Sequence, residues 1–206
     1  MAMIEIKKEN KMDRIEILKV MLMIGAIIPT LIAAYTLPGL DKFFKTAADT
    51  ELIAAAEAMK NWFTMGLVVF SCSLKGIRFF AKSFPILIMV DIGFSILVAL
   101  LGPEYLELRF YGHVLCDVIA IGGISQAINH YVMRLWEKEE LQLVCNRINL
   151  FGSIGAIAGS SAAYIYNPFS VNELLWLNVI VSVAAGIFRS FTFYSVKKEV
   201  LIKENK

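Results

Sequence analysis

Charged residues are scarce in this sequence, and their scarcity excludes an ordinary water-soluble fold. Asp, Glu, Lys and Arg make up 18% of the 206 residues, whereas 58% of the residues are hydrophobic. A soluble domain of this length carries about a quarter charged residues and is roughly half apolar. A soluble core could not hide so much apolar surface, so the composition predicts a chain that folds in lipid.

Cysteine and histidine are too few and too dispersed to hold a metal ion. Cys72, Cys116 and Cys145 lie far apart and form no C-x-x-C pair, and His113 and His130 are the only histidines. We interpret the cysteines as free buried thiols. We therefore expect no metal site and no cofactor.

The motifs of soluble enzymes are also absent. The chain contains no nucleophile elbow, P-loop, H-E-x-x-H or dinucleotide fingerprint. An enzyme would need a site inside the membrane, and only His113 and Asp117 suggest one, as a pair that acts on lipid. We therefore expect a protein that is not an enzyme and that binds no nucleic acid.

Six apolar runs are each long enough to cross a bilayer, which takes about 20 mostly apolar residues in a helix. The sequence predicts an all-α, polytopic membrane protein with a transmembrane domain at 18–194, an N-terminal segment at 1–17 and a C-terminal tail at 195–206. Short connections should make neighbouring helices antiparallel. The predicted spans are Leu18–Leu37, ended by Pro38-Gly39, then Ala54–Leu74, Phe84–Leu101 with Pro85 in its first turn, Phe110–Leu135, Leu143–Tyr166 and Leu174–Phe193.

The distribution of positive charge predicts the orientation of these spans. Sixteen of the 20 Lys and Arg residues lie in 1–19, 75–82, 134–147 and 189–206, which are the two ends of the chain and alternate connections. Cytoplasmic segments carry the excess of Lys and Arg. We therefore expect both termini in the cytoplasm and a multi-pass protein of the cell (inner or plasma) membrane. The other connections hold Lys42, Lys45, Lys60 and Arg109.

Ionisable side chains inside spans are candidates for function, because they are unfavourable in lipid. Asp91 lies near the middle of the third span, where it is either a proton- or cation-coupling site or a hydrogen-bonded group that joins two helices. His113 and Asp117 share one face of the fourth span. They are either a proton-coupling pair or an interfacial pair near the headgroups. Asn129 and His130 lie on the opposite face of that span.

The fifth span carries a polar stripe. At about 100° per residue, five polar side chains fall on one side of this helix. The stripe favours a polar wall along a solute path, and its alternative is a tightly packed central helix. Its members are Asn146, Asn149, Ser153, Ser160 and Tyr164.

A second stripe on the same span consists of Gly152, Gly155 and Gly159. Small residues let two helix backbones approach closely, and G-x-x-x-G is the usual spacing. We expect these glycines to pack against a neighbouring helix. Arg189 lies near the predicted cytoplasmic end of the sixth span, so we expect its side chain to extend toward the interface.

The residues that lead into and form the start of the fifth span are Glu140–Leu141, Arg147–Asn149 and Phe151–Gly159 (FGSIGAIAG). Together with the six-span topology, they resemble one six-helix half of a major facilitator superfamily transporter. The connection Ser73–Lys82 departs from that family, because it lacks the acidic residue usual there. The second half is missing too, so the resemblance implies that two copies associate to form a transport path.

Two functional hypotheses remain. The first is a transporter- or permease-like half-unit that moves a small solute or ion as a homodimer, with proton coupling as one option. The polar stripe and Asp91 motivate it. The alternative is a non-transporting membrane protein that binds a partner, such as an immunity factor, a regulator or a complex subunit. Its motivation is the small size and the lack of catalytic motifs. In both cases the bilayer is a partner.

Overall fold

The computed structural model describes residues 2–47, 50–101, 105, 108, 111–112, 119–166 and 168–205. These residues are almost all helical, and no strand occurs among them. The prediction of an all-helical fold is therefore confirmed for this part of the chain. Four of its helical segments are long and apolar enough to cross a membrane, namely Arg14–Thr36, Lys75–Leu100, Lys138–Ile165 and Val171–Glu204.

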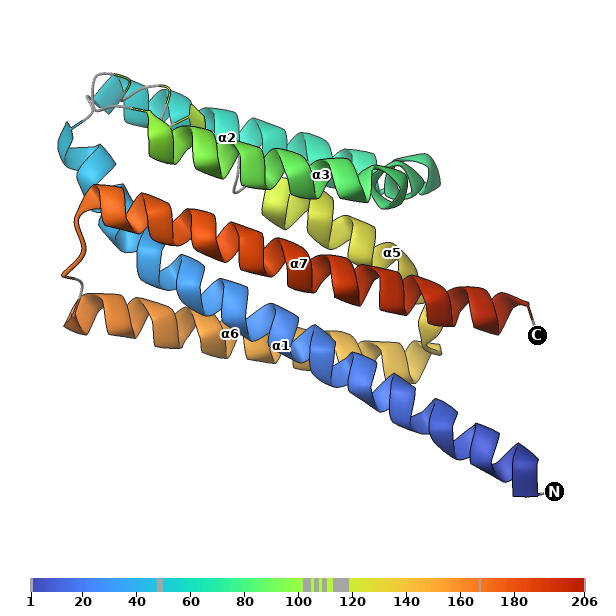
Figure 1. The fold of residues 1–206 in the computed structure, drawn as a ribbon. Coiled ribbons are helices and arrows are strands. Elements are labelled where there is room, and N and C mark those ends of the chain that lie inside the picture. Colours follow the sequence, from blue (N-terminus) through green and yellow to red (C-terminus); the bar gives the residue numbers. More distant parts are fainter. Residues whose placement is uncertain are drawn as a thin grey trace.

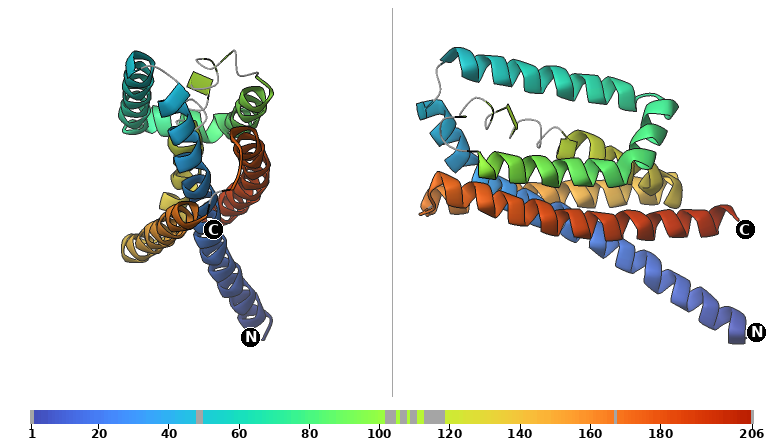
Figure 2. Two further views of the ribbon diagram at one scale, coloured as in Figure 1. Left: turned by 90° about the vertical axis from the view of Figure 1, so that its left-hand side faces the viewer. Right: turned by 45° about the horizontal axis from the view of Figure 1, so that its top comes forward.

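The long helices run up and down in one bundle (Figures 1 and 2). Its elements are α1 (Ala2–Ala47), α2 (Thr50–Ser71), α3 (Leu74–Leu100), the π-helix η2 (Ile119–Ile124), α5 (Ser125–Leu135), α6 (Lys138–Ile165) and α7 (Val171–Glu204). α1 packs on α6 and α7, and α3 and α5 pack on each other and on α7. Both termini and the α5–α6 connection lie at one end of the bundle, called here the terminal end. The α6–α7 connection lies at the other.

α1 continues beyond the point where the sequence predicts its end. Pro38 and Gly39 lie inside this helix, which reaches Ala47, so the prediction that it ends there was wrong. A proline removes one backbone hydrogen bond and kinks a helix without necessarily ending it. α1 changes direction in this part (Figures 1 and 2). At the other end, its first residues extend away from the bundle.

The corner between α2 and α3 is only two residues long. Ser73 caps α3, because its hydroxyl accepts a hydrogen bond of 2.9 Å from the Gly76 amide. A side chain at Gly76 would overlap the carbonyl oxygen of Phe70. Glycine is therefore required here for the chain to turn back so tightly.

The first turns of α3 replace the predicted basic loop. The helix begins at Leu74, so Lys75, Arg78 and Lys82 are helical residues. Pro85 consequently lies inside α3 rather than in its first turn, which corrects the sequence prediction. The helix bends in its N-terminal part (Figure 2), as expected next to a proline that cannot donate a backbone hydrogen bond.

In the part of the chain that the structure describes, two apolar clusters join the helices of the bundle. In the first, the rings of Phe84 on α3 and Phe193 on α7 stack at 3.9 Å. The second lies at the terminal end and joins α1, α5, α6 and α7. Trp136 is buried in it. The terminal-end cluster consists of Leu18, Leu22, Val132, Leu135, Trp136, Val144, Val196 and Val200.

Polar contacts fasten the same end of the bundle. Lys19 on α1 pairs with Glu140 on α6 at 2.7 Å. Arg134 on α5 pairs with Glu204 on α7, and the Lys203 ammonium donates to the Leu135 carbonyl at 3.0 Å. The terminal end is thus closed by an apolar cluster and by charged contacts between helices that are distant in sequence.

α7 is the longest helix without an internal proline. It begins in a capping box, in which the Ser170 amide donates to the Glu173 carboxylate at 2.7 Å and the Glu173 amide donates to the Ser170 hydroxyl at 3.4 Å. Its 34 residues span about 51 Å at 1.5 Å per residue. A bilayer's hydrocarbon core is roughly 30 Å thick, so α7 is longer than the apolar layer that it can cross.

Candidate functional site

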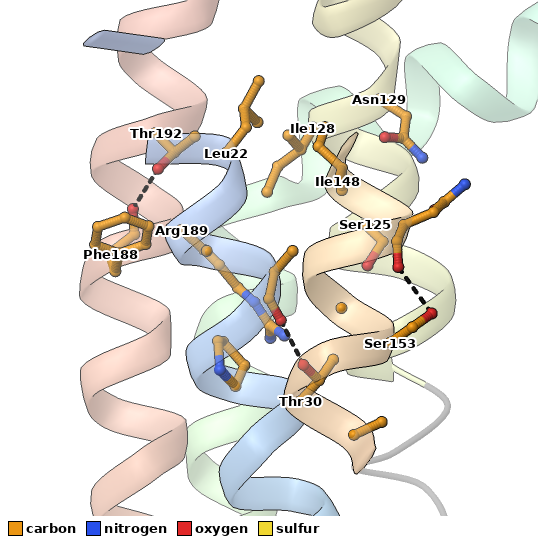
Figure 3. A pocket seen from close by; sticks show the side chains of 16 residues that line it. Leu22, Thr30, Ser125, Ile128, Asn129, Ile148, Ser153, Phe188, Arg189 and Thr192 are labelled. Atoms are coloured by element: carbon orange, nitrogen blue, oxygen red, sulfur yellow. Dashed lines mark hydrogen bonds between the residues drawn. The ribbon is translucent and has the colours of Figure 1, made fainter. Parts of the chain in front are cut away.

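A cavity of about 620 Å³ lies between α1, α5, α6 and α7, midway along the bundle (Figure 3). Its volume is in the range of small-molecule sites. About half of its lining residues are apolar. The others are polar, although they belong to helices that are mostly hydrophobic. The polar side chains in its wall are Thr30, Ser125, Asn129, Asn149, Ser153, Arg189 and Thr192.

Arg189 is the one charged residue in this wall among the described residues. It lies near the middle of α7, and its side chain points toward α1 in the cavity (Figure 3). The carboxylate of Asp91, on α3, is close enough to attract the guanidinium electrostatically. Only 4% of Asp91 is exposed. Arg189 therefore does not extend toward an interface as predicted, because its countercharge lies inside the bundle.

Three hydroxyl groups in the cavity wall donate their protons to their own helices. Thr30 donates to the Ala26 carbonyl at 2.6 Å, and Ser153 donates to the Asn149 carbonyl at 2.9 Å. Thr192 donates to the carbonyl of the residue four positions earlier at 3.0 Å. A hydroxyl that has used its proton still has lone pairs that accept hydrogen bonds. These three groups therefore offer the cavity acceptors.

Two amide side chains face the same space. Asn129 on α5 and Asn149 on α6 are both exposed and both line the cavity. Within the part of the chain that the structure describes, neither side chain makes a hydrogen bond. An amide without a partner is unfavourable in an apolar environment, so these groups require water or a bound molecule.

The glycine stripe of α6 has two different environments. A Cβ at Gly155 would lie 2.5 Å from the Ile27 carbonyl oxygen, and a Cβ at Gly159 would overlap the Leu31 carbonyl oxygen. α1 and α6 therefore approach backbone to backbone at these two glycines. Gly152 has no atom within 4 Å of such a Cβ and lines the cavity instead.

The polar stripe of α6 reaches the cavity only through Asn149 and Ser153. Asn146, Ser160 and Tyr164 are exposed outside it, and 94% of Tyr164 is accessible. The cavity is shorter than the helix, so a straight stripe runs past it at both ends.

The remaining predicted site residues lie elsewhere. His130 is half-buried, and its ring packs edge-on against Tyr131 at 4.9 Å, outside the cavity. His113 and Asp117 lie outside the described residues. No three metal-ligating side chains come together in the described ranges.

Four polar cavity residues were not predicted as site residues from the sequence. Thr30 is a single hydroxyl residue in an apolar run, whereas Ser125 precedes Gln126 and Thr192 follows Ser190 closely, and no shared pattern in the sequence marks the three as one site. Arg189 could have been found, because an arginine within an apolar run requires a countercharge and Asp91 is the only acid near the middle of a span.

An apolar groove of about 370 Å³ lies beside the cavity, between α1 and α7. Its wall contains aliphatic residues of both helices together with Pro29 and Phe188, and these last two also line the polar cavity. The Phe188 ring lies against Gly25, where an added Cβ would be 3.0 Å from it. Pro29 and Phe188 therefore form the partition between the two spaces.

The cavity has a closed side and an open side. Leu22, Ile128 and Ile148 belong both to its wall and to the packing of the terminal-end cluster, so that cluster separates the cavity from the terminal end. Asn149 and Ser153 are exposed, so the cavity opens along α6.

Comparison with known protein families, with curated proteins and with solved structures found no match to this chain.

Proposed function

We propose that this chain is a permease half-unit that holds a small polar solute in the cavity between α1, α5, α6 and α7. The observation that carries the proposal is a half-buried arginine beside amide and hydroxyl groups, placed midway along apolar helices. In lipid, a charged or unpaired polar side chain is unfavourable unless water, a countercharge or a ligand meets it. A solute that passes through the bundle would meet these groups in turn.

The half-unit follows from the open side of the cavity. Asn129, Asn149 and Ser153 are exposed on α5 and α6, so the wall is incomplete in one chain. Two copies related by a twofold axis would close the wall, and transport paths commonly lie between such halves. The resemblance to half of a major facilitator superfamily transporter implies the same assembly.

The full topology is part of the proposal. Four helices qualify as spans by length and apolarity, and we propose that α2 and the helical stretch ending in α5 supply two more. Both chain ends then lie on the cytoplasmic side of the cell membrane, together with most of the Lys and Arg residues.

Flux measurements test the proposal. The purified protein would be reconstituted in vesicles and assayed for proton movement with a pH-sensitive dye. Uptake of radiolabelled amino acids, sugars and organic acids would be measured in parallel. We expect saturable uptake of one class, reduced at least tenfold by Arg189→Gln and unchanged by Ser161→Ala, which lies on α6 outside the cavity. Vesicles that show no flux of any kind would contradict a transport function.

A second candidate function is supported by α2. Trp62, Met65 and Val69 are each more than 60% exposed, and α2 touches the other described helices over few residues. A membrane partner that covers this face would suit a regulator, an immunity factor or a complex subunit. Purification in mild detergent separates the two functions, because a stoichiometric foreign protein favours this one and a homodimer favours the permease.

A further inference from the structure

Arg189 is the one charged side chain in the cavity wall among the described residues, and the buried carboxyl of Asp91 on α3 lies outside this wall, near enough to attract the guanidinium. A simple anion would bring a net negative charge into a weakly polarisable surrounding, and a simple cation would meet the guanidinium. Both are unfavourable at low dielectric. A ligand that carries both charges adds no net charge.

The polar groups of the wall are also divided by chemistry. The guanidinium from α7 is a donor only and suits a carboxylate, which it can bind through two hydrogen bonds. α6 presents Ser153 and α1 presents Thr30 (Figure 3), and Asn149 on α6, whose amide includes an acceptor oxygen, also lines the cavity. The hydroxyls of Thr30 and Ser153 have already donated their protons to carbonyl oxygens. What they offer a ligand is therefore lone pairs, which suit an ammonium group.

The apolar part of the wall determines what else the ligand carries. Leu22, Ile128 and Ile148 line the cavity toward the terminal end, and Phe188 lines it toward the apolar groove. A ligand made only of charged groups would leave these side chains facing water. An aliphatic side chain would cover them and gain about 25 cal/mol for each Å² of apolar area removed from water.

We propose that the cavity binds a small zwitterion of the amino-acid class, with its carboxylate on Arg189 and its ammonium group among the oxygens of Thr30, Asn149 and Ser153. An aliphatic side chain then packs on the apolar wall. This inference rests on the proposed solute-binding role of the cavity and names the class of solute.

Equilibrium binding with matched probes tests the inference. Radiolabelled leucine would be bound to the purified full-length protein in lipid nanodiscs. N-acetyl-leucine, which lacks the ammonium group, and leucinamide, which lacks the carboxylate, would compete for the site. We expect saturable leucine binding and competition by either analogue that is at least tenfold weaker than competition by unlabelled leucine. Equal competition by either analogue, or no binding of leucine to monodisperse protein, would overturn the inference.

Variants connect the binding to the named groups. Arg189→Gln should abolish leucine binding, and Ser153→Ala should weaken it several-fold, whereas Ser161→Ala should leave it unchanged. The double variant Asp91→Asn/Arg189→Gln removes both charges, so neither charge is left without its countercharge. We expect this variant to fold and still to fail to bind leucine. Leucine binding retained by this double variant would overturn the role of the guanidinium.

The result of the leucine-binding experiment can be distinguished from the result of the flux measurement. Leucine binding without any flux contradicts the permease and supports the zwitterion site. Flux of another solute class without leucine binding supports the permease and overturns the zwitterion site.

Discussion

At the scale of single residues, Asp91 and Arg189 are two ionisable side chains within the apolar helices α3 and α7. Each would be unfavourable in lipid without the other, because an isolated charge is poorly solvated at low dielectric. Asp91 is almost completely buried, and the two charges attract one another across α3 and α7. This attraction acts beside the stacked rings of Phe84 and Phe193, which pack the same two helices, and the guanidinium itself lies in the cavity wall.

Removing one member of this pair should destabilise the protein strongly. Asp91→Asn or Arg189→Gln alone leaves a charge without its countercharge, and we expect a loss of roughly 3 kcal/mol or more in the free energy of unfolding. The double variant should lose clearly less than the sum of the two single losses. Unfolding in detergent, followed by tryptophan fluorescence, measures all three. Additive losses would show that the two side chains do not interact.

The candidate site could be predicted from the sequence only where a polar residue stood out within its own span, as Asn129 did. Asn149 and Ser153 fall on one face of the fifth span by periodicity, and both line the cavity. Thr30 and Arg189 come from other helices, and periodicity says nothing about which helices become neighbours. Asn146 and Tyr164 show the opposite error, because a helical face continues beyond the cavity that part of it lines.

At the scale of secondary structure elements, α1 and α6 approach most closely. Gly155 and Gly159 lie directly against carbonyl groups of α1, so the backbones themselves are in contact. Such contacts depend on the absence of side chains. The pairing of these helices also sets the distance between the two walls of the cavity.

Adding one methyl group should distinguish the glycines of α6. Gly159→Ala forces its Cβ into the Leu31 carbonyl oxygen, so we expect a loss of about 1–3 kcal/mol in the free energy of unfolding. Gly152→Ala is the matched control, because the added Cβ meets open space, and its effect should stay within about 0.5 kcal/mol. Thermal unfolding of both variants in the same detergent makes the comparison. Equal losses would contradict the close approach at Gly159.

The start of α7 depends on a reciprocal cap. Ser170→Ala removes the acceptor for the Glu173 amide, and we expect a loss of about 1 kcal/mol in the free energy of unfolding. Ser170→Thr keeps a hydroxyl and should lose much less. Hydrogen exchange of the first turn of α7 reports the effect locally. Exchange that is unchanged in the alanine variant would argue against the cap.

The presence of helices could be predicted from composition, whereas the residues at which they begin and end could not. Apolar runs predict helices wherever they occur, but an end depends on the balance between a local penalty and distant packing. Pro38 carries such a penalty and α1 nevertheless continues, whereas Ser73 and Gly76 start α3 well before the apolar run predicts. The basic residues that looked like a loop are helical because this corner needs only two residues.

At the scale of the whole molecule, the two ends of the bundle differ. The terminal end carries both chain ends, the charged contacts of Lys19 and Arg134, and a packed apolar cluster. The opposite end carries the connection into Ser170. From the excess of Lys and Arg at the terminal end we predict that this end faces the cytoplasm.

Labelling of single cysteines checks this orientation. The native cysteines would be replaced by alanine, and Asn172→Cys or Lys198→Cys would be added. A membrane-impermeant maleimide should label the first variant in intact cells and the second only after permeabilisation. The reverse pattern would mean the opposite orientation. Labelling of both sites from outside would contradict the placement of the α7 ends on opposite sides.

The partition formed by Pro29 and Phe188 has a consequence for the chemistry of the interior. Pro29 and the Phe188 ring separate the cavity with the guanidinium from the apolar groove, whose aliphatic wall suits hydrocarbon chains. If that ring swung aside or were truncated, an acyl tail could slide in from the bilayer while its acidic head met the arginine. Access of acyl chains from the apolar groove to the arginine therefore depends on the partition formed by Pro29 and Phe188.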